Sequence, residues 1–171
     1  VICVLDPHTR KPHHAIWAVI RRDDSIYVDQ ELVMPGTIRE LAKQILLTEQ
    51  RAGYKMAKRL IDPNFGRTPN LVTGRSVIDE LRQPPFVVHF GEADDDKEAG
   101  ILKVRELLHW DKTLPIDLVN TPRLFFHHRC VENLSIFTLG RHLDYLSTER
   151  GGGMSVHAVD RVRDGILSLE S

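Results

Sequence analysis

Two aspartates in this chain each follow a short apolar run and each precede a proline. Asp6 follows VICVL at residues 1–5, and Asp62 follows RLI at residues 59–61. Apolar, β-branched runs of this kind are typical of buried strands. A buried strand that ends in a carboxylate places a charge at the rim of a sheet, and two such strands side by side would bring two carboxylates together. Because Mg²⁺ prefers oxygen ligands, the pattern predicts a divalent-cation site.

A third carboxylate is available near the end of the chain. The segment HAVDRVRD at residues 157–164 is expected to open a helix, and Asp160 lies near its start. Phosphodiester cleavage requires an activated water and a clamp on developing negative charge, and two divalent cations about 3.5–4 Å apart provide both. We therefore expect Asp6, Asp62 and Asp160 to be catalytic, metal-binding residues that hold a pair of cations.

Each acid also has a purely structural interpretation. An aspartate before a proline often opens a turn, because its side chain bonds the backbone nearby. Asp160 would also be favoured at a helix N-terminus by the helix dipole. Glu31, near the end of an expected strand, is interpreted as an exposed edge residue, and the acidic run at 94–96 as a solvated helix start.

The elements that must position these residues alternate along the chain. Thr37 predicts an N-cap with Glu40 completing a capping box, and Gly53 predicts the end of that helix. A loop rich in Gly, Pro and Asn at residues 63–74 is long enough to be an active-site rim. Strands are predicted at residues 1–5, 14–20, 26–32, 57–61, 86–90 and 124–126, and helices at 38–52, 76–82, after 96, 133–146 and 157–169.

This order predicts an α/β fold. Three antiparallel strands, followed by parallel strands linked through helices, form the ribonuclease H arrangement, a mixed sheet flanked by helices. In that arrangement the first strand neighbours the strand after the first helix, so Asp6 and Asp62 would share one sheet edge. The length of 171 residues suits one domain, which we expect to span residues 1–171.

Charge and composition restrict the partners. A formal net charge of −1 argues against a strongly basic, histone-like protein, but basic side chains gather locally. Apolar content of 42% and charged content of 27% are typical of a soluble globular chain, without the run of about 20 apolar residues that a membrane span needs. Cys3, in a strand, and Cys130, in a helix-like segment, fit reduced, buried thiols. The candidate DNA-binding residues are Arg10, Lys11, His13, Arg161 and Arg163.

Several segments together form a recognisable set: LDPH at 5–8, KPHHA at 11–15, Trp17, LIDP at 60–63, residues 94–108 and 124–133, and HAVDRVR at 157–163. This set resembles the nuclease domain of bacteriophage large terminases. The likeness covers nearly the whole chain, and it implies a ribonuclease H-like endonuclease that needs Mg²⁺ or Mn²⁺ and cuts double-stranded viral DNA during genome packaging.

The resemblance has further implications. The family commonly carries an aromatic residue after its final arginine, where this chain has Asp164, so Asp164 is a reserve for the third acid and His157 a reserve ligand. The missing start methionine suggests a C-terminal fragment, and since it has no GxxxxGK[S/T] loop, we expect no ATP site in it. The implied partners are the terminase ATPase domain, the small terminase subunit and the portal, in the host cell cytoplasm.

Two alternatives remain open. The same fold and carboxylates also serve junction resolvases and nucleases that cut RNA:DNA hybrids, because the acids do not encode the substrate. A different class of protein, a packaging-motor module that grips DNA or docks on a portal without cutting, would bind no metal at these acids.

Overall fold

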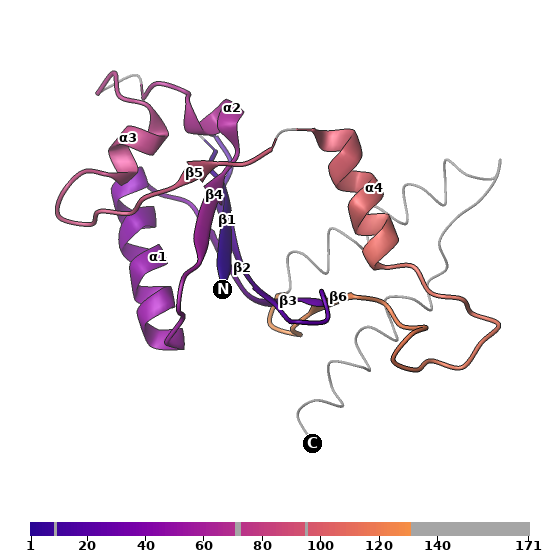
Figure 1. Ribbon diagram of the computed structural model, residues 1–171. Helices are drawn as coiled ribbons and strands as arrows, with labels where there is room; N and C mark the ends of the chain where they lie inside the picture. The colour runs from indigo at the N-terminus through magenta and orange to yellow at the C-terminus, as the bar shows by residue number, and fades with distance from the viewer. Residues whose placement is uncertain (9, 71–72, 95, 131–171) are drawn as a thin grey trace. The chain divides into compact units, whose positions relative to one another are not determined.

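The computed structural model describes residues 1–8, 10–70, 73–94 and 96–130, which form an α/β fold with a mixed sheet (Figure 1). Six strands follow the order β5-β4-β1-β2-β3-β6. The strands are β1 (Ile2–Asp6), β2 (His13–Ile20), β3 (Ile26–Met34), β4 (Lys58–Ile61), β5 (Gly91–Glu92) and β6 (Leu124–Phe126). The helices are α1 (Ile38–Ala52), α2 (Pro63–Gly66), α3 (Val77–Leu81) and α4 (Lys97–Leu107).

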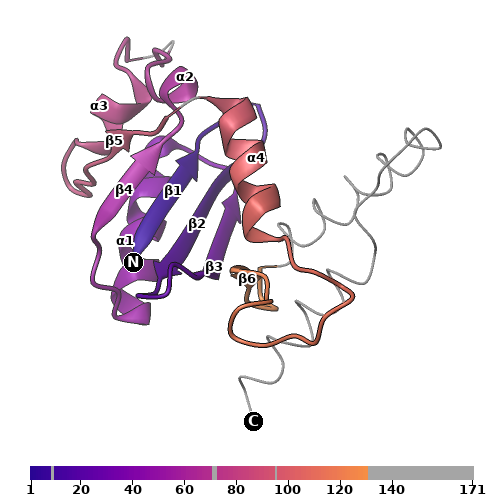
Figure 2. The ribbon, with the colours of Figure 1, turned by 45° about the vertical axis from the view of Figure 1, so that its right-hand side comes forward.

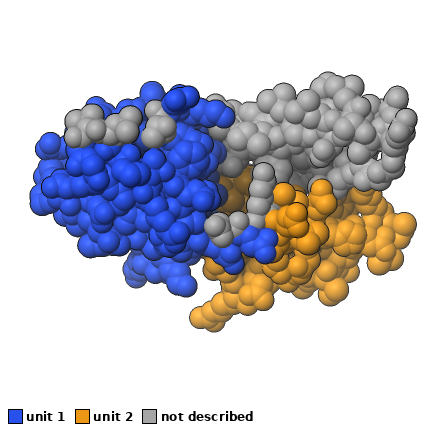
Figure 3. All heavy atoms as spheres, turned by 90° about the horizontal axis from the view of Figure 1, so that it is seen from above, with its two compact units in different colours: residues 1–19, 31–96 blue, residues 20–30, 97–171 orange. Residues whose placement is uncertain are grey.

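The chain divides into two compact units (Figure 3). The first unit comprises Val1–Val19 and Glu31–Asp96. The second unit comprises Ile20–Gln30 together with Lys97–Ser171, of which residues 131–171 are not described. The expected helices at 133–146 and 157–169 therefore lie outside the described residues.

The central pairing of the sheet confirms the prediction from the element order. β1 pairs with β2 in antiparallel fashion and with β4 in parallel fashion. The chain reaches β4 from β3 through α1, so a helical connection joins the parallel neighbours. The strand that follows the first long helix therefore lies beside the first strand, as in the expected arrangement.

One face of this sheet is covered by α1 (Figures 1 and 2). Alternate residues of β1 and β2 point into the core because successive side chains of a strand face opposite sides. Trp17 is completely buried there, as expected of a core residue. The inward residues are Cys3 and Leu5 of β1, Ala15 and Trp17 of β2, Ile61 of β4, and Leu41, Ala42 and Ile45 of α1.

Both ends of α1 are formed as the sequence predicts. The Thr37 side chain accepts a hydrogen bond from the Glu40 backbone, and the Glu40 carboxylate accepts one from the Thr37 N–H. Gly53 ends the helix in the left-handed conformation with φ 64°, which a residue without Cβ adopts at little cost.

Two local predictions are wrong. Residues 86–90 form no strand, because the Val88 N–H donates to the Leu81 carbonyl at the end of α3 and the ladder begins only at Gly91. The stretch from Pro63 is not all loop, because its first four residues form α2 with Asp62 as N-cap.

The second unit contains the β3–β6 pair and α4. Ile26 to Val28 pair in parallel with Leu124 to Phe126, as expected for the short strand at 124–126. Cys130 is buried, as predicted for a reduced thiol, and its thiol donates to the Val28 carbonyl at 3.5 Å, but it follows a turn after β6 instead of lying in a helix.

Candidate active site

The backbone brings Asp6 and Asp62 to the same end of two adjacent strands. Asp6 is the last residue of β1, and Asp62 directly follows β4. The register pairs Leu5 with Ile61, and the Asp62 N–H donates to the Leu5 carbonyl at 3.0 Å. Neighbouring strands lie about 4.8 Å apart, so the two aspartates occupy neighbouring positions at one sheet edge.

The Asp6 side chain is accessible and lightly engaged. It is 51% exposed, and its Oδ2 lies 3.2 Å from Nε2 of His8, two residues further along the chain. The His8 ring in turn packs edge-on against Phe65, with ring centroids 4.7 Å apart. Asp6 therefore presents carboxylate oxygen at the edge of the sheet, next to an aromatic pair.

Asp62 has a structural role as well as its place at the edge. Its Oδ1 accepts hydrogen bonds from the backbone N–H groups of Asn64 at 2.7 Å and Phe65 at 3.2 Å, which caps α2. Pro63 occupies the first turn, where its missing N–H has no partner to lose. Within the described residues, all the hydrogen bonds of this carboxylate go to Oδ1.

A third acid at the same edge is already neutralised. Glu92 of β5 pairs in register with Ile61 of β4, and its carboxylate forms a two-pronged ion pair with Arg67. The hydrogen bond from Arg67 holds the pKa of Glu92 below its ordinary value. Glu92 is therefore committed to Arg67.

His13, predicted to contact DNA, is 3% exposed. Its Nδ1 accepts a hydrogen bond from the His8 N–H at 3.1 Å, so the other ring nitrogen carries the proton and donates to the Gly36 carbonyl at 3.0 Å. This side chain ties the segment after Asp6 to the segment before α1. Arg10 and Lys11 are exposed in the same loop, as a DNA contact requires.

The structure also places a histidine beside Asp6 and a glutamate near that histidine, a pair that the sequence did not single out. His14 pairs with Asp6 across the β1–β2 ladder, and Nε2 of His14 lies 3.8 Å from Oε2 of Glu31. The Glu31 side chain is 5% exposed, so its interpretation as an exposed edge residue is wrong: β3 continues past it to Met34. The sequence signal for the position of His14 was the alternation in HHAIWAVI, which places His14 on the face of β2 that points away from the core.

The donor set suits a hard divalent cation, but the described residues supply only part of a site. Asp6 and Asp62 offer oxygen ligands, the type that Mg²⁺ and Mn²⁺ prefer. No group of three or more His, Cys, Asp or Glu side chains within the described residues is arranged to hold a metal ion. The remaining predicted residues, Asp160, Asp164, His157, Arg161 and Arg163, lie outside the described residues.

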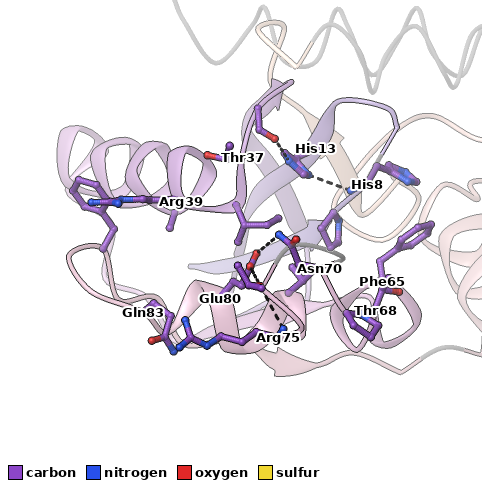
Figure 4. Close-up of a pocket in the computed structure, with 18 of the residues that line it drawn as sticks. His8, His13, Thr37, Arg39, Phe65, Thr68, Asn70, Arg75, Glu80 and Gln83 are labelled. Atoms are coloured by element: carbon purple, nitrogen blue, oxygen red, sulfur yellow. Dashed lines mark hydrogen bonds between the residues drawn. The ribbon is translucent and has the colours of Figure 1, made fainter.

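A pocket of about 690 Å³ adjoins the two aspartates (Figure 4). Neither aspartate lines it, but Pro7 and His8, which follow Asp6, and Phe65, which follows Asp62, do. The loop at 63–74, predicted to be an active-site rim, forms part of its wall, but the rest of the pocket was not predicted because its other walls come from separate loops and helix ends.

No helix within the described residues is long and apolar enough to cross a membrane. The chain matches no protein-family model, no curated protein and no solved structure.

Proposed function

We propose that this protein is a metal-dependent endonuclease with a ribonuclease H-like fold, of the type found in bacteriophage large terminases. The observation that carries the proposal is the meeting of Asp6 and Asp62 at the ends of two adjacent parallel strands. Sequence motifs that resemble the terminase nuclease also support it, because two of them contain these aspartates and others lie elsewhere in the chain.

Asp6 and Asp62 would hold Mg²⁺ or Mn²⁺, and the terminase motif adds Asp160, with Asp164 and His157 in reserve. Two such cations would supply the charge that lowers the pKa of an attacking water and stabilises a developing phosphorane. Exposed Arg10 and Lys11, with Arg161 and Arg163, would contact the DNA phosphates. His13 takes no part in this contact, because backbone groups occupy both of its ring nitrogens.

The same resemblance supplies the biological setting. The substrate would be double-stranded viral DNA, cut in the host cell cytoplasm during packaging. The terminase ATPase domain, the small terminase subunit and the portal would present that DNA, which fits the near-neutral charge of this chain.

The decisive experiment measures Mn²⁺-dependent nicking of supercoiled plasmid by Asp6→Asn and Asp62→Asn. Each variant should lose activity by more than about 100-fold, because charge stabilisation by a cation is worth several kcal/mol of transition-state energy. Asn is itself a good N-cap, so Asp62→Asn should retain α2.

A matched control is Asp24→Asn, in the turn between β2 and β3. Asp24 has φ 61°, a left-handed conformation that Asn tolerates, and its side chain is exposed. This control should nick at the wild-type rate. Full activity in Asp6→Asn or Asp62→Asn would refute the assignment.

A module that binds DNA or a portal without cutting is the second candidate. One observation favours it: the hydrogen bonds that the described residues make to Asp62 serve a helix cap. That candidate predicts no nicking by the wild type and no Mn²⁺ between Asp6 and Asp62 in a soaked crystal.

If the wild type does nick, comparison of its cleavage of linear duplex, four-way junction and RNA:DNA hybrid identifies the substrate.

A further inference from the structure

The pocket beside the aspartates has the size of a ligand site. Its volume of about 690 Å³ falls within the range of roughly 300–1,000 Å³ that is typical of small-molecule sites. Its walls come from the loop after β1, the start of α1, the α2–α3 region and the segment before residue 87, all in the first unit (Figure 4). The contact between His8 and Asp6 links the pocket to the candidate active site.

Aromatic rings form part of the wall. His8 and Phe65 stand edge to face, with an angle of 69° between their ring planes, and Phe86 also lines the pocket. Apolar contacts from Pro7 and Pro84 add to the same lining. A flat heteroaromatic ring would stack on such walls, as nucleobases do on aromatic side chains.

The charge of the lining favours a ligand that also carries anionic groups. Arg39 and Arg75 are both exposed, and neither guanidinium forms an ion pair within the described residues. Arg39 lies in the first turn of α1, where the helix dipole disfavours a cation, so helix stability does not explain its position.

The pocket has one acidic side chain among its lining residues, and that acid is already bonded. Glu80 accepts hydrogen bonds from Nδ2 of Asn70 and from Oγ1 of Thr73. Two arginines against this one carboxylate leave the charged side chains of the lining net positive, which suits a phosphate.

We propose that this pocket binds an unpaired stretch of a DNA strand, with one base against Phe65 and His8 and the phosphates of neighbouring nucleotides at Arg75 and Arg39, on the other side of the pocket (Figure 4). The phosphate that follows the bound base in the other direction would then lie toward Asp6 and Asp62. The identity of the strand rests on the proposed nuclease function, whereas occupation of the pocket does not require a cation or cleavage.

The test measures binding of a fluorescein-labelled oligothymidylate and of a blunt duplex of equal length, by anisotropy in EDTA. Wild type should bind the single strand more tightly than the duplex. Phe65→Ala should weaken single-strand binding by about 5- to 150-fold, the range for loss of one base–aromatic stack, and leave duplex binding unchanged. Phe65→Leu keeps an apolar side chain at α2 and should show the same selective loss if Phe65→Ala folds poorly.

The phosphate contact has its own variant and control. Arg39→Gln should weaken single-strand binding and reduce the magnitude of the salt slope by about 0.7, the contribution of one phosphate. Arg51→Gln makes the same change in charge in the last turn of the same helix, outside the pocket, and should change neither quantity.

The proposal is overturned if the wild type prefers duplex, if the Phe65 variants weaken both ligands equally, or if Arg39→Gln behaves as Arg51→Gln does. These results are separate from those of the nicking experiment. Selective binding without nicking would support the single-strand site and contradict the nuclease function. Nicking without selective binding would support the nuclease function and contradict the single-strand site.

Discussion

Carboxylates occupy two very different settings in the first unit. Glu49 is 6% exposed; its Oε1 accepts hydrogen bonds from Nε1 of Trp17 and Nε of Arg59, and its Oε2 accepts one from Nη2 of Arg59 at 2.6 Å. Asp6, at the sheet edge, is half exposed, and its Oδ2 lies 3.2 Å from Nε2 of His8. A buried charge must be fully paired to be tolerated, whereas an exposed one keeps oxygen available for a ligand.

The neighbours of Glu49 show how strongly it is committed to the fold. Its hydrogen bonds raise the pKa of Arg59 above its ordinary value. Burial, and next the negative charge of Glu49, raise the pKa of the Cys3 thiol. Arg59 and Cys3 thus each keep one protonation state at neutral pH, as expected of structural residues and not of catalytic ones.

The largest expected effect on stability comes from removing the buried carboxylate of Glu49. Glu49→Ala leaves Arg59 without its buried partner and should lower the free energy of unfolding by about 3 kcal/mol, while nicking per folded molecule persists. Urea denaturation checks the first statement and plasmid nicking the second. Asp6→Asn should lose nicking but keep a denaturation midpoint near that of the wild type. Equal destabilisation by both variants would break the comparison.

Asp62 sharpens the comparison because it belongs to both settings. Asp62→Ala removes the α2 cap and should be less stable than Asp62→Asn by about 1 kcal/mol, the usual worth of an N-cap, while both variants lose nicking. Thermal unfolding of the two variants in EDTA measures the difference. If they unfold at the same temperature, the cap contributes nothing and Asp62 belongs to the active edge alone.

The smallest effect concerns Glu40, which shows that exposure alone does not mark a chemical site. Hydrogen bonds from Thr37, first from its backbone N–H, hold the pKa of Glu40 below its ordinary value of 4.5. A lowered pKa stabilises the fold above the unfolded value, and this stabilisation disappears as the pH falls through the folded value.

The corresponding measurement follows the melting temperature of wild type and Glu40→Gln from pH 6 to pH 3. Gln retains the capping geometry but does not titrate in this range. The advantage of the wild type at pH 6 should therefore shrink as the pH falls. A difference that stays constant over this range would contradict the assignment.

The sequence predicted the features that depend on local signals and on strand order. The Thr37–Glu40 capping box and the end of α1 at Gly53 could be predicted because each rests on a short pattern. The α/β class could be predicted because it rests on the order of the elements. The neighbouring positions of Asp6 and Asp62 followed from the crossover through α1. The narrower ribonuclease H assignment, and the roles of the residues beyond 130, stay predictions.

What failed depended on contacts between distant segments. The apolar run at 86–90 indicated burial correctly, since Val88 and Phe90 are in the core, but burial does not specify a ladder partner. Periodicity likewise could not show that Glu49 meets Arg59 and Trp17, because those three lie on three different elements. The helix at Pro63 did carry a local signal, an N-cap Asp followed by Pro, which a loop-rich composition outweighed.

The capping of α2 by Asp62 has a consequence for the protein before any cation arrives. Two carboxylates at the ends of adjacent strands repel each other, and that repulsion opposes the pairing of β1 with β4. The N–H groups of Asn64 and Phe65 stabilise one of the two charges, so the edge can assemble without a counter-ion. The fold therefore does not depend on a counter-ion at this edge, and removal of the proposed cations would leave the chain folded.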